Sequence, residues 1–120
     1  MSNGDERARA AKPEDLGRLF VERANAGDVD GLVALYESNA TVAFPPGHVA
    51  VGTDAIRRVY EHLLASRPTF TAGDQHPALR VGDLALTSTR LVGGGATAEV
   101  ARRQPDGTWR WLIDQPSVFG

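Results

Sequence analysis

The fold is decided by residues 84–114, which read LALTSTRLVGGGATAEVARRQPDGTWRWLID. Apolar and polar side chains alternate through much of this stretch, and a period of two residues indicates β-strands. The glycines at 93–95 and the Pro-Asp-Gly sequence at 105–107 interrupt the alternation, and both are typical of turns. The stretch therefore predicts an antiparallel meander.

The last strand of this meander has two distinct faces. Trp109 and Trp111 fall on one face, and Arg110 and Asp114 fall on the other, because successive side chains of a strand point in opposite directions. If the tryptophans face the core, Asp114 is expected to face solvent or a partner subunit. Asp114 is therefore the weaker of two candidate catalytic residues.

Upstream of about residue 69 the apolar period is helical. The spacing predicts a helix from Pro13 to the glycine at 27, and a shorter one from Asp28 to Tyr36. A short strand is expected over 40–44, and a third helix from Thr53 to before Pro68. Helices followed by an antiparallel meander predict an α+β fold, with the helices on one face of a curved sheet.

Length and composition are those of one globular domain. The chain has 120 residues, 42% of them apolar, and we expect a flexible tail over 1–12 and a single domain over 13–120. The absence of cysteine excludes disulfides and thiolate chemistry. A net charge of −2 without a dense basic stripe argues against nucleic acid as a partner. No apolar run is long enough for a membrane span, and no signal peptide is evident, so a cytoplasmic protein is expected.

Several segments carry a resemblance to a known family. They are residues 20–32 (FVERANAGDVDGL), 40–42 (ATV) with Pro45, 52–57 (GTDAIR), and 105–110 (PDGTWR) with Ile113 and Asp114. Together they resemble the ketosteroid isomerase-like proteins, and the closing segment is similar to their SnoaL-like branch. The resemblance covers about residues 14–118. It implies the conical α+β barrel of the cystatin-like, nuclear transport factor 2-like fold, and a homodimer formed through the outer face of the sheet.

The resemblance also implies where an isomerase would place its catalytic groups. The carboxylate base falls at Phe44 and the main oxyanion tyrosine at Phe20, and neither phenyl ring can take or donate a proton. The second oxyanion acid falls at Glu99. The chain is therefore not expected to be an authentic steroid isomerase.

Glu99 is the principal catalytic candidate, and two interpretations of it remain open. In one, its carboxyl faces a pocket, where burial raises its pKa and fits it for acid–base chemistry. In the other, it forms an ordinary ion pair with Arg90 across the glycine hairpin. The roles of Tyr36 and Tyr60 also remain open, because each hydroxyl could bind a ligand or form a hydrogen bond within the core.

The expected pocket is aromatic and apolar. Its predicted lining is Phe20, Leu32, Tyr36, Phe44, Tyr60 and Trp111, with His48 near its mouth. Such a lining favours a neutral, ring-containing ligand and disfavours nucleotides and sugar phosphates. The three histidines form no recognised ligand pattern, so neither a metal nor a cofactor is expected.

Three functional hypotheses follow. The first is that the protein binds an apolar, ring-containing small molecule and performs cofactor-free chemistry of the isomerase, cyclase or lyase type. The second is a binding protein without catalysis, which the phenylalanines at the base and donor positions favour. The third is an accessory subunit that binds another protein through its sheet face.

Overall fold

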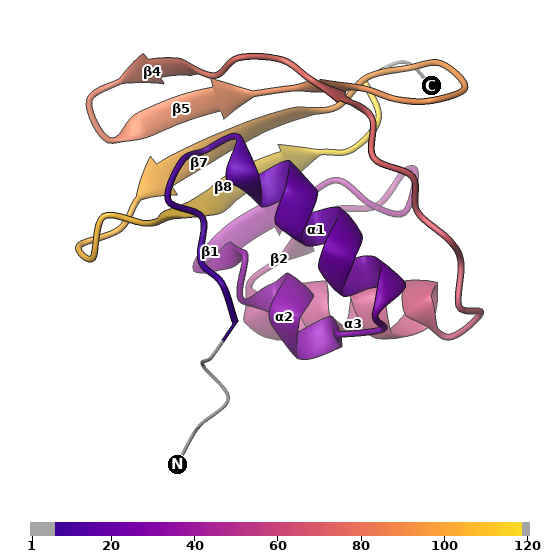
Figure 1. The fold of residues 1–120 in the computed structure, drawn as a ribbon. Helices are drawn as coiled ribbons and strands as arrows, with labels where there is room; N and C mark the ends of the chain where they lie inside the picture. The colour runs from indigo at the N-terminus through magenta and orange to yellow at the C-terminus, as the bar shows by residue number, and fades with distance from the viewer. Residues whose placement is uncertain (1–6, 119–120) are drawn as a thin grey trace.

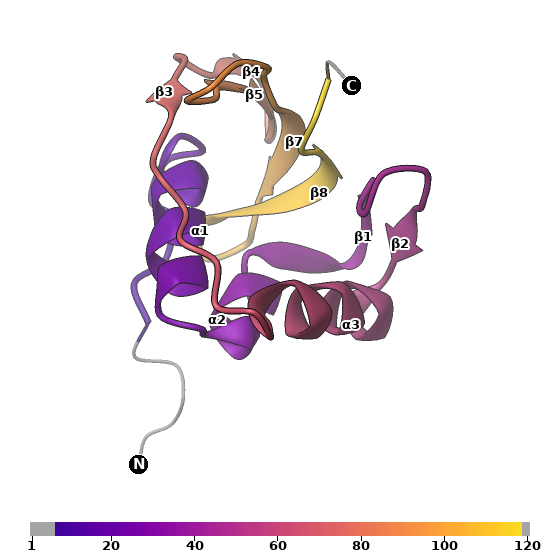
Figure 2. The same ribbon diagram turned by 90° about the vertical axis from the view of Figure 1, so that its right-hand side faces the viewer.

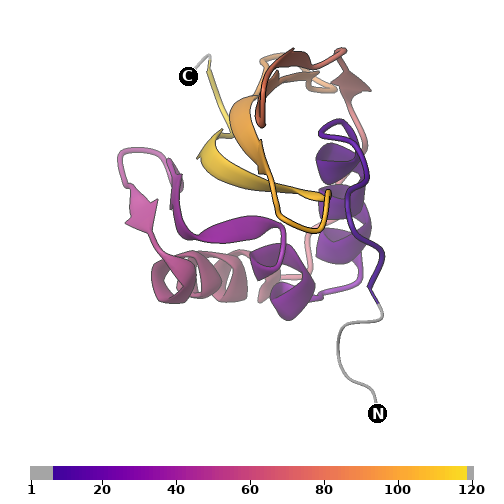
Figure 3. The same ribbon diagram turned by 90° about the vertical axis from the view of Figure 1, so that its left-hand side faces the viewer.

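A six-stranded sheet, a separate pair of short strands and three helices make up the part of the chain that the computed structural model describes, residues 7–118 (Figure 1). The helices are α1 (Asp15–Asn25), α2 (Val29–Val33) and α3 (Thr53–Leu64). Figures 2 and 3 show the sheet bending, so that its strands and the helices enclose a common interior. The predicted α+β architecture is confirmed.

The sheet has the strand order β2-β1-β8-β7-β5-β4. Its strands are β1 (Tyr36–Val42), β2 (Ala50–Val51), β4 (Leu79–Val81), β5 (Leu84–Thr87), β7 (Ala98–Arg103) and β8 (Trp109–Gln115). All neighbouring strands are antiparallel except β1 and β8, which are parallel. A separate pair joins β3 (Asp74–Gln75) to β6 (Thr89–Arg90).

The helices bury one apolar face each. Leu16 and Leu19 of α1 are buried at helical spacing, as are Ile56 and Tyr60 of α3. These side chains pack with the inward face of β8, where Trp111 is buried. None of the described helices has the length and apolar character that crossing a membrane requires.

The second helix is shorter than the sequence predicts. It ends at Val33, and Tyr36 begins β1 instead of closing the helix. The cause is pairing with the last strand, because the Trp111 amide donates to the Leu35 carbonyl at 2.7 Å. Apolar residues at this spacing suit a helix face or a buried strand, and the distant strand decides between them.

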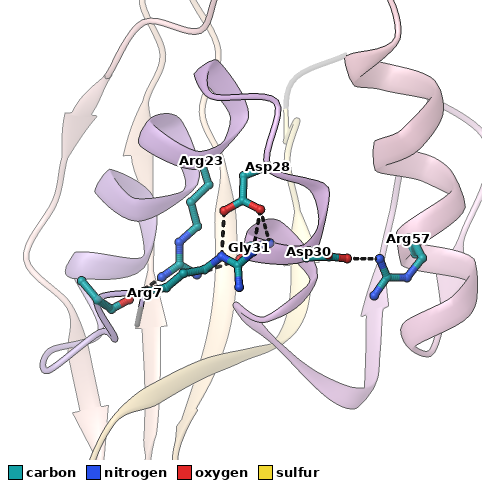
Figure 4. Close-up of polar contacts among 7 residues, drawn as sticks. Arg7, Arg23, Asp28, Asp30, Gly31 and Arg57 are labelled. Carbon is teal, nitrogen blue, oxygen red and sulfur yellow. Dashed lines mark hydrogen bonds and ion pairs between the residues drawn. The ribbon is translucent and has the colours of Figure 1, made fainter. Parts of the chain in front are cut away.

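Residues 7–12 lie against the domain, although the sequence predicts a flexible tail over 1–12. Ala10 is buried and its carbonyl accepts a hydrogen bond from the Trp109 amide at 2.9 Å. Arg7 pairs with Asp28 at 2.7 Å, and Arg23 donates to the carbonyl oxygens of Ala8 and Gly31 (Figure 4). The remainder of the predicted tail, residues 1–6, lies outside the described residues.

The outer face of the sheet carries a row of mostly apolar side chains, which we call the outer stripe. Strand registers place one residue of each of the six strands in this row: Val51, Thr41, Ile113, Val100, Leu86 and Leu79. Leu79 is 70% exposed and Leu86 is 47% exposed. Exposed apolar rows of this kind are typical of surfaces that associate.

Candidate functional site

A cavity of about 300 Å³ lies between α1, α3 and the inner face of the sheet. Its apolar walls include Phe20, Phe44, Leu63, Phe70 and Trp111. This volume is at the lower end of the range for small-molecule sites, which are usually lined by apolar side chains and a few polar groups. The two carboxyl groups among the lining residues, Glu99 and Asp114, lie on β7 and β8.

The segment between α3 and β3 closes one side of the cavity and runs close to α1 (Figure 2). Its aromatic residue, Phe70, is held by Asn25 at the end of α1. The Asn25 amide donates to the Phe70 carbonyl at 2.9 Å and accepts from the Phe70 amide at 2.7 Å. These two hydrogen bonds fix the backbone that carries the Phe70 ring to the wall.

Two carboxyl groups, Glu99 and Asp114, line the cavity from adjacent strands. They are directly paired across β7 and β8, and both are buried, at 7% and 5% exposure. Directly opposite residues of an antiparallel pair have Cβ atoms roughly 5 Å apart. The two carboxyls therefore form one acid pair in the cavity wall.

The inward position of Asp114 corrects the prediction that it faces solvent or a partner. Ala101 pairs with Trp111 and Val100 pairs with Ile113, so Leu112 is an extra residue in β8. This β-bulge shifts the alternation of side chains by one position. Trp111 and Asp114 consequently share the inner face, whereas Ile113 is exposed.

Asp114 has a strongly perturbed pKa. Burial disfavours its charged form and is the main cause, the charge of Glu99 adds to it, and together they raise the pKa of Asp114 to about 7. The Tyr36 hydroxyl opposes this shift by donating to Oδ2 of Asp114 at 2.6 Å. One proton is therefore readily gained or lost by this pair near neutral pH.

Glu99 is held by neighbouring threonines. The Thr87 hydroxyl donates to Oε1 of Glu99 at 2.7 Å, and burial raises the pKa of Glu99 although hydrogen bonds from Thr97 and Thr87 lower it. Arg90 is exposed on β6 and forms no ion pair with Glu99. Of the two interpretations of Glu99, the geometry matches the carboxyl that faces a pocket.

Two tyrosine hydroxyls extend from the acid pair. The hydroxyl oxygens of Tyr36 and Tyr60 lie 2.6 Å apart, and both side chains are buried. Burial is the main cause that raises the pKa of each phenol, so both remain protonated donors. The result is a chain of hydrogen bonds from Tyr60 on the cavity wall through Tyr36 to Asp114.

The predicted lining is reproduced in part. Phe20, Phe44, Tyr60 and Trp111 border the cavity, and Tyr36 reaches it through Asp114. Leu32, by contrast, is fully buried in the core and does not border the cavity.

His48 does not border the cavity either. It lies in a separate hollow, which shares Phe44 and Leu63 with the cavity and also holds His62 and Arg58. His76 borders another hollow beside the glycine turn. Within residues 7–118, no three His, Asp or Glu side chains are grouped closely enough to hold a metal ion.

Sequence reasoning missed Phe70 and Thr97 as wall residues and Thr87 as a partner of Glu99. Phe70 carries a usable signal, because it is the only large apolar residue between Leu64 and Leu79. A lone aromatic in an otherwise polar connection indicates a buried contact. The threonines carry no such signal, because their place beside Glu99 depends on strand register.

This architecture, helices on a curved sheet around an apolar cavity, defines a cystatin-like, nuclear transport factor 2-like protein. A family model for the SnoaL-like domain matches residues 18–115. The chain belongs to this family, as the sequence resemblance predicts.

Solved structures share the fold at low sequence identity. One, from Thiobacillus denitrificans, is named for a calcium/calmodulin-dependent protein kinase type II association domain; it is 17% identical, with a TM-score of 0.75 and coverage of 92% of this chain and 98% of that chain. A ketosteroid isomerase-like protein from Erwinia carotovora is 18% identical, with a TM-score of 0.68 and coverage of 89% and 94%. A nuclear transport factor 2-like protein from Novosphingobium aromaticivorans is 22% identical, with a TM-score of 0.67 and coverage of 89% and 80%. At these identities the similarity concerns the fold.

Proposed function

We propose that the protein binds a largely apolar, ring-containing small molecule in its cavity and catalyses proton transfer on it without a cofactor. The observation that carries the proposal is the acid pair, Glu99 and Asp114, placed in an aromatic wall. Two like charges this close disfavour double ionisation, so near neutral pH the pair holds a carboxylate and a carboxylic acid together. The carboxylate can remove a proton from a ligand, and the acid can donate one to its oxygen.

The walls support a ring-containing ligand. Phe20 is the centre of an aromatic group, with ring centroids 5.8 Å from Tyr60, 5.9 Å from Phe70 and 6.1 Å from Trp111. A flat apolar ring entering this space gains by removing its surface from water, at about 25 cal/mol per Å². None of the described lining residues is a lysine, arginine or histidine, so a phosphorylated ligand would meet no positive charge.

Exchange of hydrogen for deuterium in 2-tetralone tests the proposal without knowledge of the natural ligand. In heavy water, removal of an α-proton by the carboxylate gives an enolate, and its return to the ketone introduces deuterium. We expect the protein to accelerate this exchange, and Glu99→Gln or Asp114→Asn to reduce the acceleration by about 10²–10⁴. Glu61→Gln, which alters an exposed acid of α3, is the matched control.

A second candidate function is binding without catalysis. Phe20 and Phe44 favour it, because they stand on the cavity wall where the resemblance implies the isomerase's donor and base. The same experiment separates the two functions. If the protein binds 2-tetralone but does not accelerate its deuterium exchange, catalysis is excluded and binding alone remains. Under either function we expect no turnover of a Δ5-3-ketosteroid above background.

We also propose that the protein forms a homodimer through the outer stripe. The support is the unbroken row across all six strands, whose exposed members Leu79, Leu86, Ile113 and Val51 are aliphatic. The sequence resemblance implies the same face. A protein partner at this face is the remaining alternative, and it would make the chain an accessory subunit.

A further inference from the structure

Resting on the proposed function of the same cavity, we propose that its natural ligand is an organic cation, an aromatic or alicyclic ring that carries one protonated amine. Two independent features of the cavity lead to this ligand class. One is the aromatic walls, and the other is the acid pair without a compensating charge.

The walls supply several π-systems within reach of one ligand. Phe20, Phe44, Tyr60, Phe70 and Trp111 all border the same space of about 300 Å³. The faces of aromatic rings carry partial negative charge and attract an ammonium group, most strongly where water is excluded. A ring with one amine therefore finds favourable contacts for both of its parts.

The acid pair lacks a counter-charge on the protein. None of the described residues that line the cavity carries a positive charge, and Asp114 receives a single hydrogen bond, on Oδ2 from Tyr36. Its second oxygen, Oδ1, has no hydrogen-bond partner among the described residues. The residue is nevertheless buried, with only 5% of its surface exposed. An ammonium donor placed there would form a charge-assisted hydrogen bond with this oxygen.

The groups that face Asp114 act together on its charge. Glu99 on β7 disfavours its ionisation, whereas Tyr36 on β1 donates to it and Tyr60 on α3 supports Tyr36. In the unliganded cavity a bound proton reduces the electrostatic repulsion between the two carboxyl groups. A bound ammonium supplies a positive charge beside the pair, so it lowers the pKa of Asp114 and releases this proton in part.

A neutral ligand would gain the contacts with the aromatic rings but not the attraction between a positive charge and the acid pair. An anionic ligand would be repelled by the carboxylate that remains. The cavity therefore discriminates by charge as well as by shape, and it favours cation over neutral molecule over anion.

The test compares 1-naphthylmethylamine with 1-naphthylmethanol, which match in ring and size and differ in the amine. In isothermal titration calorimetry near pH 8, we expect the amine to bind at least about tenfold more tightly than the alcohol. Between about pH 6 and pH 8 the amine stays protonated, so its affinity should rise with pH as Asp114 ionises. Titrations near pH 6, where Asp114 still holds its proton, in buffers of different ionisation enthalpy should show protons released with the amine and none released with the alcohol.

Variants distinguish the contribution of the acid pair to binding from that of the aromatic walls. Asp114→Asn and Glu99→Gln should each weaken amine binding by about tenfold or more and leave the affinity for the alcohol within about tenfold, while Glu61→Gln should change neither. Equal affinities for amine and alcohol, or amine binding without proton release, would overturn the cation inference and leave the proposed apolar-ring site standing. If neither probe binds to the folded protein, the proposed function fails with it.

Discussion

Asp114 relies on one neighbouring hydroxyl to favour its charged form. Tyr36 donates to Oδ2, and this hydrogen bond opposes the effects of burial and of Glu99 on the pKa. We expect Tyr36→Phe to raise the pKa of Asp114 above about 7, as followed by the ¹³C shift of its carboxyl carbon during a pH titration. Tyr60→Phe is the control and should have a smaller effect, because Tyr36 can still donate. A pKa that falls in Tyr36→Phe would contradict the assigned hydrogen bond.

The same carboxyl makes stability depend on pH. Its pKa is about 7 in the folded protein, against 3.8 for an aspartate exposed to water, so between these values the folded state binds more protons than the unfolded state. Stability from this group is therefore fully present at low pH and is lost as the pH rises through about 7.

Asp114→Asn removes this dependence, because an amide does not titrate. We expect the variant to gain about 2–3 kcal/mol relative to the parent between about pH 5 and pH 8, measured by urea denaturation at both values. Parallel pH profiles of the two proteins would show that the folded-state pKa of Asp114 is not raised.

At the scale of elements, Asp28 joins the start of α2 to the N-terminal segment. Its Oδ1 accepts from the Gly31 amide at 2.9 Å, and the carboxylate pairs with Arg7 (Figure 4). Asp28→Ala should lower the free energy of unfolding by about 1–2 kcal/mol, because it removes the cap and the ion pair. Asp28→Asn keeps a capping oxygen and should cost less, by urea denaturation. Equal losses in Asp28→Ala and Asp28→Asn would assign the effect to charge instead of capping.

The sequence predicted elements well where one local period prevails. Leu16 and Leu19, or Ile56 and Tyr60, suit only a helix that faces a core, and both helices form. Tyr36 suited two structures, and its pairing with Trp111, 75 residues away in the chain, made it a strand residue. The free energy of pairing with a distant strand cannot be inferred from a short stretch of sequence around Tyr36.

The candidate site was predicted only in part for a similar reason. Glu99 follows the regular alternation of β7, so its inward position could be inferred as one of two alternatives. Asp114 follows a bulge at Leu112, and a bulge is a property of two paired strands that the sequence of one strand does not reveal.

At the scale of the whole molecule, the outer stripe predicts association. Leu79→Lys combined with Leu86→Lys places charges in the row and should turn a dimer into a monomer at micromolar concentration, as measured by sedimentation equilibrium. Val92→Lys changes an equally exposed apolar residue at the glycine turn and should leave the mass unchanged. A parent protein that sediments as a monomer would refute the proposed homodimer.

The alternation of side chains along β7, and along β8 after its bulge, has a consequence for protein engineering. It places Asp114 inward directly beside the outward Ile113, just as Glu99 lies beside Val100 in β7. Substitutions at neighbouring positions of these strands therefore change opposite faces of the sheet. A mutant library confined to Phe20, Phe44, Leu63 and Phe70 can reshape the cavity while every side chain of the outer stripe keeps its parental chemistry.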